Sequence, residues 1–120
     1  MNSGINCPIC GKYNFDDFSD YDVCSVCGWK INITQYDDHD FSNGTNILSV
    51  NDYRLEYTLL QNPETAPKVK AMKDEFMEEF NAIRREFRDG GRLKSGITCE
   101  QSRGKEIAAR EKYVLALKAL

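Results

Sequence analysis

The sequence lacks a membrane-spanning stretch, because no apolar run approaches the ~20 residues that cross a bilayer. Its first six residues contain no cationic side chain and no apolar stretch, so they do not form a secretory signal. We therefore expect a cytoplasmic protein with no membrane partner. The formal charge of −3 also argues against bulk attraction to nucleic acid or to an anionic membrane.

Histidine is almost absent, since His39 is the single histidine among 120 residues. The sequence also contains no nucleophile elbow, no phosphate-cradling glycine loop and no histidine cluster that leaves a metal position open. These absences exclude most histidine-dependent catalysis, and we expect no enzymatic activity. His39 itself stands in an aspartate-rich stretch and is interpreted as a solvated loop residue.

Charge is unevenly distributed along the chain. Residues 1–45 have two lysines, seven aspartates and no glutamate or arginine, a side-chain balance of −5. They are rich in Gly, Asn and Asp, which is typical of turns and short strands. Residues 46–120 have 14 basic and 12 acidic side chains and are rich in helix formers. We predict an α+β fold with a small head over 1–45 and a helical region over 46–120 packed on it.

Three helices are predicted in the second part. The first spans residues 50–61 and is capped by Ser49. The second spans residues 68–88, where apolar side chains recur with a mean spacing of about 3.6 residues, and a Gly-Gly pair ends it. The third runs to the C-terminus from either Thr98 or Ser102, because an interior glycine leaves its start open.

The cysteines carry the most specific signal. Four of the five form two Cys-x-x-Cys-Gly motifs, with thirteen residues between the pairs. Two intervening residues let both sulfurs of a pair reach one ion from a tight turn, and the glycine tolerates a positive φ. Four thiolates complete the tetrahedral shell of zinc at ~2.3 Å. We therefore predict a zinc-ribbon-like head whose ion is bound by Cys7, Cys10, Cys24 and Cys27.

Alternatives to zinc remain open at this stage. Four-thiolate iron centres use similar turns, and iron would make the chain a rubredoxin-like electron carrier. A redox dithiol is a weaker interpretation, because it usually comes as one pair. A filled shell leaves no position for water, so either metal would be structural rather than hydrolytic. The isolated Cys99 is interpreted as a partly buried spectator.

Three segments carry a family resemblance. They read CPICG at residues 7–11, YDVCSVCGW at 21–29 and NILS at 46–49, followed by Arg54 and Tyr57. Together they resemble the cysteine-rich CPCC family over about residues 5–60, although Ile9 replaces the family's usual third cysteine. The resemblance implies a zinc-ribbon module found largely in bacteria. Some members of this family resemble immunity or accessory proteins of toxin systems.

The aspartate run next to the head is one candidate contact surface. We favour a non-catalytic protein-interaction module, for example of the immunity or inhibitor type, whose acidic head covers a basic partner. The candidate contacts are Asp37, Asp38, Asp40 and Trp29. A merely solvated acidic loop is the plainer alternative, and for Trp29 a place in the core of the head is preferred.

A basic segment offers a second candidate surface. Residues 84–105 have seven basic and three acidic side chains. The alternative function is therefore a nucleic-acid-binding zinc ribbon, and the plainer interpretation is a solvated helix end. Its contacts would be Arg84, Arg85, Arg88, Arg92 and Lys94.

Overall fold

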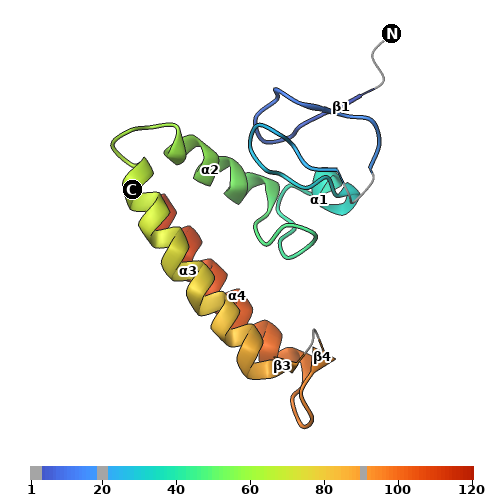
Figure 1. Ribbon diagram of the computed structural model, residues 1–120, viewed down its shortest axis with the longest axis vertical. Coiled ribbons are helices and arrows are strands. Elements are labelled where there is room, and N and C mark those ends of the chain that lie inside the picture. The colour runs from blue at the N-terminus through green and yellow to red at the C-terminus, as the bar shows by residue number, and fades with distance from the viewer. Residues whose placement is uncertain (1–3, 19–21, 90–91) are drawn as a thin grey trace. The chain divides into compact units, whose positions relative to one another are not determined.

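The computed structural model describes residues 4–18, 22–89 and 92–120. The chain forms two compact units, residues 1–61 and 62–120. The first contains the cysteine turns and two helices, and the second is a helical hairpin (Figure 1). The first unit extends past the expected head boundary at residue 45, because the following helix packs into the core of the cysteine turns. That the helical region packs on the head stays a prediction.

Short strands and longer helices confirm the α+β prediction. Strand β1 pairs with β2, and β3 with β4, both antiparallel. Helices α3 and α4 run side by side in the second unit (Figure 1). The elements are, in chain order, β1 (Ile5–Asn6), β2 (Asn14–Phe15), α1 (Ile33–Asp37), α2 (Val50–Leu60), α3 (Ala66–Phe87), β3 (Arg88–Asp89), β4 (Arg92–Leu93) and α4 (Cys99–Lys118).

The helices begin where their caps stand. Ser49 accepts a hydrogen bond at its side chain from the first turn of α2, as predicted. Thr98 and Gln101 form a reciprocal capping box that sets the start of α4. Helix α3 ends at Phe87, and the predicted stop at the Gly-Gly pair, residues 90–91, lies outside the described residues. Helix α1 and the short β3–β4 pair were not predicted.

The first unit has a small core that includes two of the cysteines. Its fully buried large side chains are Phe15, Trp29 and Ile31, and Tyr53 of α2 packs edge-on against Trp29 with ring centroids 5.1 Å apart. Trp29 therefore belongs to the core, as preferred. Its candidate role as a partner contact is corrected, because a fully buried side chain offers no surface to a partner.

A buried amide network holds the chain between α1 and α2. The Gln35 side chain is fully buried, and its Nε2 donates to the carbonyls of Phe41 (3.2 Å), Asn46 (3.1 Å) and Leu48 (3.0 Å). Its Oε1 accepts from the backbone and the side-chain N–H of Asn46. The Asn46 side chain also pairs with both backbone groups of Lys30. Hydrogen bonds from these two amide side chains, rather than the hydrogen bonds of a β-sheet, hold this loop in place.

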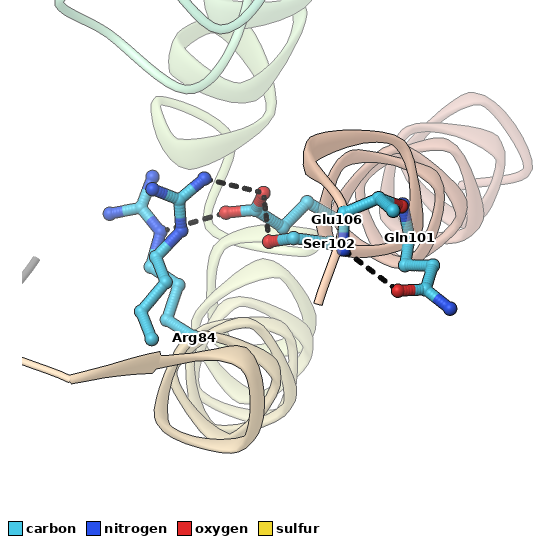
Figure 2. A network of polar contacts seen from close by, with 6 residues as sticks. Arg84, Gln101, Ser102 and Glu106 are labelled. Atoms are coloured by element: carbon cyan, nitrogen blue, oxygen red, sulfur yellow. Dashed lines mark hydrogen bonds and ion pairs between the residues drawn. The ribbon is translucent and has the colours of Figure 1, made fainter. Parts of the chain in front are cut away.

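The second unit is held by an aromatic stack and a buried carboxylate. Phe76 of α3 stacks on Tyr113 of α4, with ring centroids 4.7 Å apart. Glu106 of α4 is only 3% exposed and accepts from Arg84 Nε at 3.0 Å. Figure 2 shows this pair bridging α3 and α4, with the Ser102 hydroxyl donating to the same carboxylate. The buried carboxylate is thus satisfied by partners from both helices.

The Gln35 network leads to a stability prediction. Gln35→Ala should lower the free energy of unfolding by about 2–4 kcal/mol, because several buried backbone groups lose their only partner side chain. Denaturant unfolding followed by Trp29 fluorescence measures this. Gln61→Ala, at the exposed C-cap of α2, is the matched control and should change stability by less than about 0.5 kcal/mol. Equal effects of the two substitutions would contradict the role given to Gln35.

Candidate metal centre

Both cysteine motifs fold into the same type of turn. In the first, Gly11 N–H donates to the Cys7 carbonyl at 3.1 Å; in the second, Gly28 N–H donates to the Cys24 carbonyl at 2.9 Å. The two glycines have φ values of 69° and 82°, so both adopt the left-handed conformation that their position in the motif predicted. Each of these turns directs the sulfur atoms of its two cysteines toward the same point.

The four sulfur atoms converge as a metal site requires. They lie within 4.8 Å of one another. The Cys7–Cys27 and Cys10–Cys24 sulfur distances are both 3.6 Å. A tetrahedral shell with metal–sulfur bonds of ~2.3 Å separates its sulfurs by about 3.8 Å, whereas a disulfide needs about 2.05 Å. The spacing therefore fits four ligands around one ion, and the four residues are those that the sequence predicted.

Backbone donors surround the sulfurs. The Cys24 sulfur accepts from the N–H groups of Val26 and Cys27, and the Cys10 sulfur accepts from Lys12 N–H, all at 3.4 Å. Burial works to raise the pKa of Cys24, but these donors outweigh it and the pKa is lowered. Burial raises the pKa of Cys27. Buried thiolates of this kind need a nearby cation, which a bound metal ion supplies.

Helix α2 contacts both cysteine turns. The Tyr53 hydroxyl donates to the Cys27 carbonyl at 2.7 Å, and Arg54 Nε donates to the Pro8 carbonyl. A Cβ atom on Gly28 would lie 3.3 Å from the same hydroxyl, so Tyr53 closes tightly over the second turn. Burial and the neighbouring Cys27 raise the pKa of Tyr53. The helix therefore locks the relative position of the two motifs.

Tyr53 was not predicted as part of the site, and Arg54 was known only from the segment that resembles the family. No spacing rule connects a helical tyrosine to a carbonyl 26 residues earlier. The one available signal was the position of both residues, side by side in the first turns of a capped helix that follows the cysteines. Gln35 gave no signal either, because a buried glutamine is indistinguishable from a solvated one in the sequence.

The aspartates of the acidic loop, residues 37–40, are exposed. Asp38 accepts from the N–H of Asp40 at 3.0 Å, and Asp40 accepts from the Asn51 side chain at 2.7 Å. The His39 carbonyl accepts from Asn51 N–H, so the start of α2 holds the loop in place. His39 is not among the four cluster residues, which are all cysteines. The aspartate side chains of this loop are therefore exposed, while hydrogen bonds hold its backbone in place.

The basic segment is largely engaged in contacts within its own unit. Arg84 and Arg88 both approach the buried Glu106, at 3.0 and 3.9 Å (Figure 2). Arg85, Arg92 and Lys94 are exposed. The structure thus divides this candidate surface into two structural arginines and three solvated cations. Cys99 is exposed at the start of α4, which corrects the expectation that it is partly buried.

The fold and site define a class of α+β protein with a four-cysteine centre suited to metal binding. The profile of the cysteine-rich CPCC family matches residues 5–75, and the chain belongs to this family. The match runs beyond the expected residue 60 and into α3. Neither the curated proteins nor the solved structures contain a significant match. Within the described residues, no helix is long and apolar enough to span a bilayer.

The contact of α2 with the second turn can be tested by removing one oxygen atom. Tyr53→Phe should destabilise the metal-loaded protein by about 1 kcal/mol, because the partly buried Cys27 carbonyl loses its donor. Tyr57→Phe, one helical turn along, is the matched control, since its hydroxyl makes no hydrogen bond within the described part of the chain. Denaturant midpoints for both variants decide the point. An unchanged Tyr53→Phe midpoint would show that α2 does not depend on this bond.

Proposed function

We propose that the chain is a non-catalytic, zinc-binding protein-interaction module. The observation that carries the metal assignment is the convergence of four sulfurs within 4.8 Å on two matching turns. Zinc is preferred to iron because it is abundant and redox-inert, while the ligand set suits both. Four protein ligands fill a tetrahedral shell, which makes the site structural.

Zinc would contribute most of the folding free energy of the first unit. Few large apolar side chains are fully buried there, and β1 and β2 are two residues long. Small zinc modules gain on the order of 10 kcal/mol from the metal. That amount exceeds what a few buried side chains supply after the entropy cost of ordering the chain. The metal would therefore keep the acidic loop in a binding-competent shape.

The partner that best fits this unit is a basic protein surface. Residues 1–45 have a side-chain balance of −5, to which four thiolates on one divalent ion add about −2. Asp37, Asp38 and Asp40 stand exposed on a loop that α2 holds in place. A preformed acidic surface accelerates association with a basic one and restricts the choice of partner. Family resemblance to immunity and accessory proteins of toxin systems supports an inhibitor of this type.

Nucleic-acid binding through residues 84–105 has less support. Binding of this kind depends on cations that release counterions from phosphates. Arg84 and Arg88 are committed to Glu106, and Lys105 lies 3.8 Å from Glu86. The remaining cations are Arg85, Arg92, Lys94 and Arg103, and the aromatic residue of this segment, Phe87, is buried. This function is kept as an outcome of the charge experiment below.

Metal content tests the first half of the proposal. The purified protein should contain one zinc ion per chain by elemental analysis, and Cys24→Ser should remove it while Cys99→Ser should not. Removal of zinc by a strong chelator should change Trp29 fluorescence. Trp29 directly follows the second turn, and its ring lies in the same core as Cys7 and Cys24. Iron in place of zinc would support the electron carrier. The absence of any metal would defeat the proposal.

Charge substitutions test the second half. Replacing Asp37, Asp38 and Asp40 by Asn should slow association with a basic partner recovered from the source cell and flatten its salt dependence. Asn preserves the side-chain oxygens that accept hydrogen bonds in the loop. The control replaces Arg85, Arg92 and Lys94 by Gln and leaves the structural arginines intact. If only the control weakens binding, and nuclease abolishes it, the nucleic-acid alternative is correct.

A further inference from the structure

A groove in the second unit lies outside the metal centre and the acidic loop. It is a hollow of about 320 Å³ between α3 and α4. Phe76, Ala109 and Tyr113 are its buried lining residues, and the stacked rings of Phe76 and Tyr113 make its base rigid. The volume lies at the lower end of the range of about 300–1000 Å³ for ligand pockets. The groove is open to solvent along the two helices.

Small side chains create this hollow. Ala82 on α3 and Ala109 and Ala116 on α4 all line it, where larger side chains would fill the space between the helices. The flexible side chain of Met72 also lines it. Empty apolar volume at a helix–helix contact costs stability, because its lining atoms lose contact partners. An apolar side chain from another molecule would recover that loss.

The charged lining residues of the groove are mainly acidic. Glu75, Glu78 and Glu79 line the α3 side, against Lys112 on α4. Lys112 already pairs with Glu79 at 3.3 Å. Glu75 and Glu78 are exposed, and neither forms an ion pair within the part of the chain that the structure describes. An occupant of the groove therefore needs an apolar group to contact Phe76 and Tyr113, and a positive charge to pair with Glu75 or Glu78.

From these features we infer that the groove binds a basic amphipathic helix of a partner protein. One face of that helix inserts a bulky apolar side chain above Phe76 and Tyr113, and its lysines or arginines pair with Glu75 and Glu78. Charge complementarity favours this occupant over an acidic or uncharged one. The inference goes beyond the proposed function, since it assigns a second contact surface that needs neither zinc nor the acidic loop.

A peptide probe tests the inference on the full-length, metal-loaded chain. The probe is a fluorescein-labelled helical peptide of about 18 residues, with leucines at helical spacing and lysines beside them. A scrambled peptide of identical composition controls for attraction to the acidic protein. We expect the amphipathic peptide to bind at least about tenfold more tightly by fluorescence anisotropy. Equal affinity for the two peptides would overturn the inference.

Matched variants locate the binding site. Ala116→Phe fills the groove and should weaken peptide binding about tenfold or more. Ala108→Phe adds the same ring at an exposed position of α4 outside the groove and should have no effect. Circular dichroism confirms that both variants keep their helices. If both rings weaken binding equally, or neither does, the groove is not the site.

Charge variants and the oligomeric state complete the test. Glu75→Gln with Glu78→Gln should weaken peptide binding and flatten its salt dependence, whereas Asp74→Asn with Glu111→Gln changes the net charge equally outside the groove and should not. Sedimentation of the chain alone should show a monomer. A dimer that Ala116→Phe dissociates and Ala108→Phe does not would overturn the inference, and would assign the groove to a second copy. Loss of peptide binding on neutralising Asp37, Asp38 and Asp40 would also overturn it.

Discussion

The first unit depends on the convergence of four sulfur atoms from two turns that are distant in the sequence. The strands on either side are too short to hold those turns together, and the core contains few large side chains. Buried thiolates repel one another unless a cation lies between them. A metal ion at the four-cysteine cluster, as we propose, would supply that cation and would compensate for the small amount of sheet.

Helix α2 connects the cysteine cluster to the exposed acidic loop. It reaches the first turn through Arg54 and the second through Tyr53, and its first residues hold the acidic loop through Asn51. The Gln35 and Asn46 amides then fix the chain that leads into α2. The loop is therefore connected to the metal centre by a short series of hydrogen bonds. Through this connection, a metal bound at the cluster would influence the geometry of the loop that we propose as the contact surface.

The sequence predicted those features that depend on local chemistry. Ser49 caps α2 as predicted, because its side chain accepts from an N–H group of the first turn, and the Cys-x-x-Cys-Gly spacing fixes the cysteine turns. The sequence leaves the start of the last helix open between Thr98 and Ser102, and the capping box at Thr98 decides it. Features that depend on distant contacts were not accessible. Nothing in the neighbouring sequence distinguishes the buried Glu106 from the exposed acids of the same helix, and Cys99 was expected to be partly buried but is exposed. Long-range packing decides burial, and residue type alone does not.

The acidic loop and the basic segment use charge in different ways. In the basic segment, Arg84 and Arg88 both approach Glu106, so their charges are balanced within their own unit. In the first unit, the aspartates of residues 37–40 remain exposed and bond only to the loop and to α2. Paired charges contribute little long-range field, whereas an unpaired cluster of one sign attracts the opposite sign over about a Debye length. This contrast favours the acidic loop over the basic segment as the surface that selects a partner.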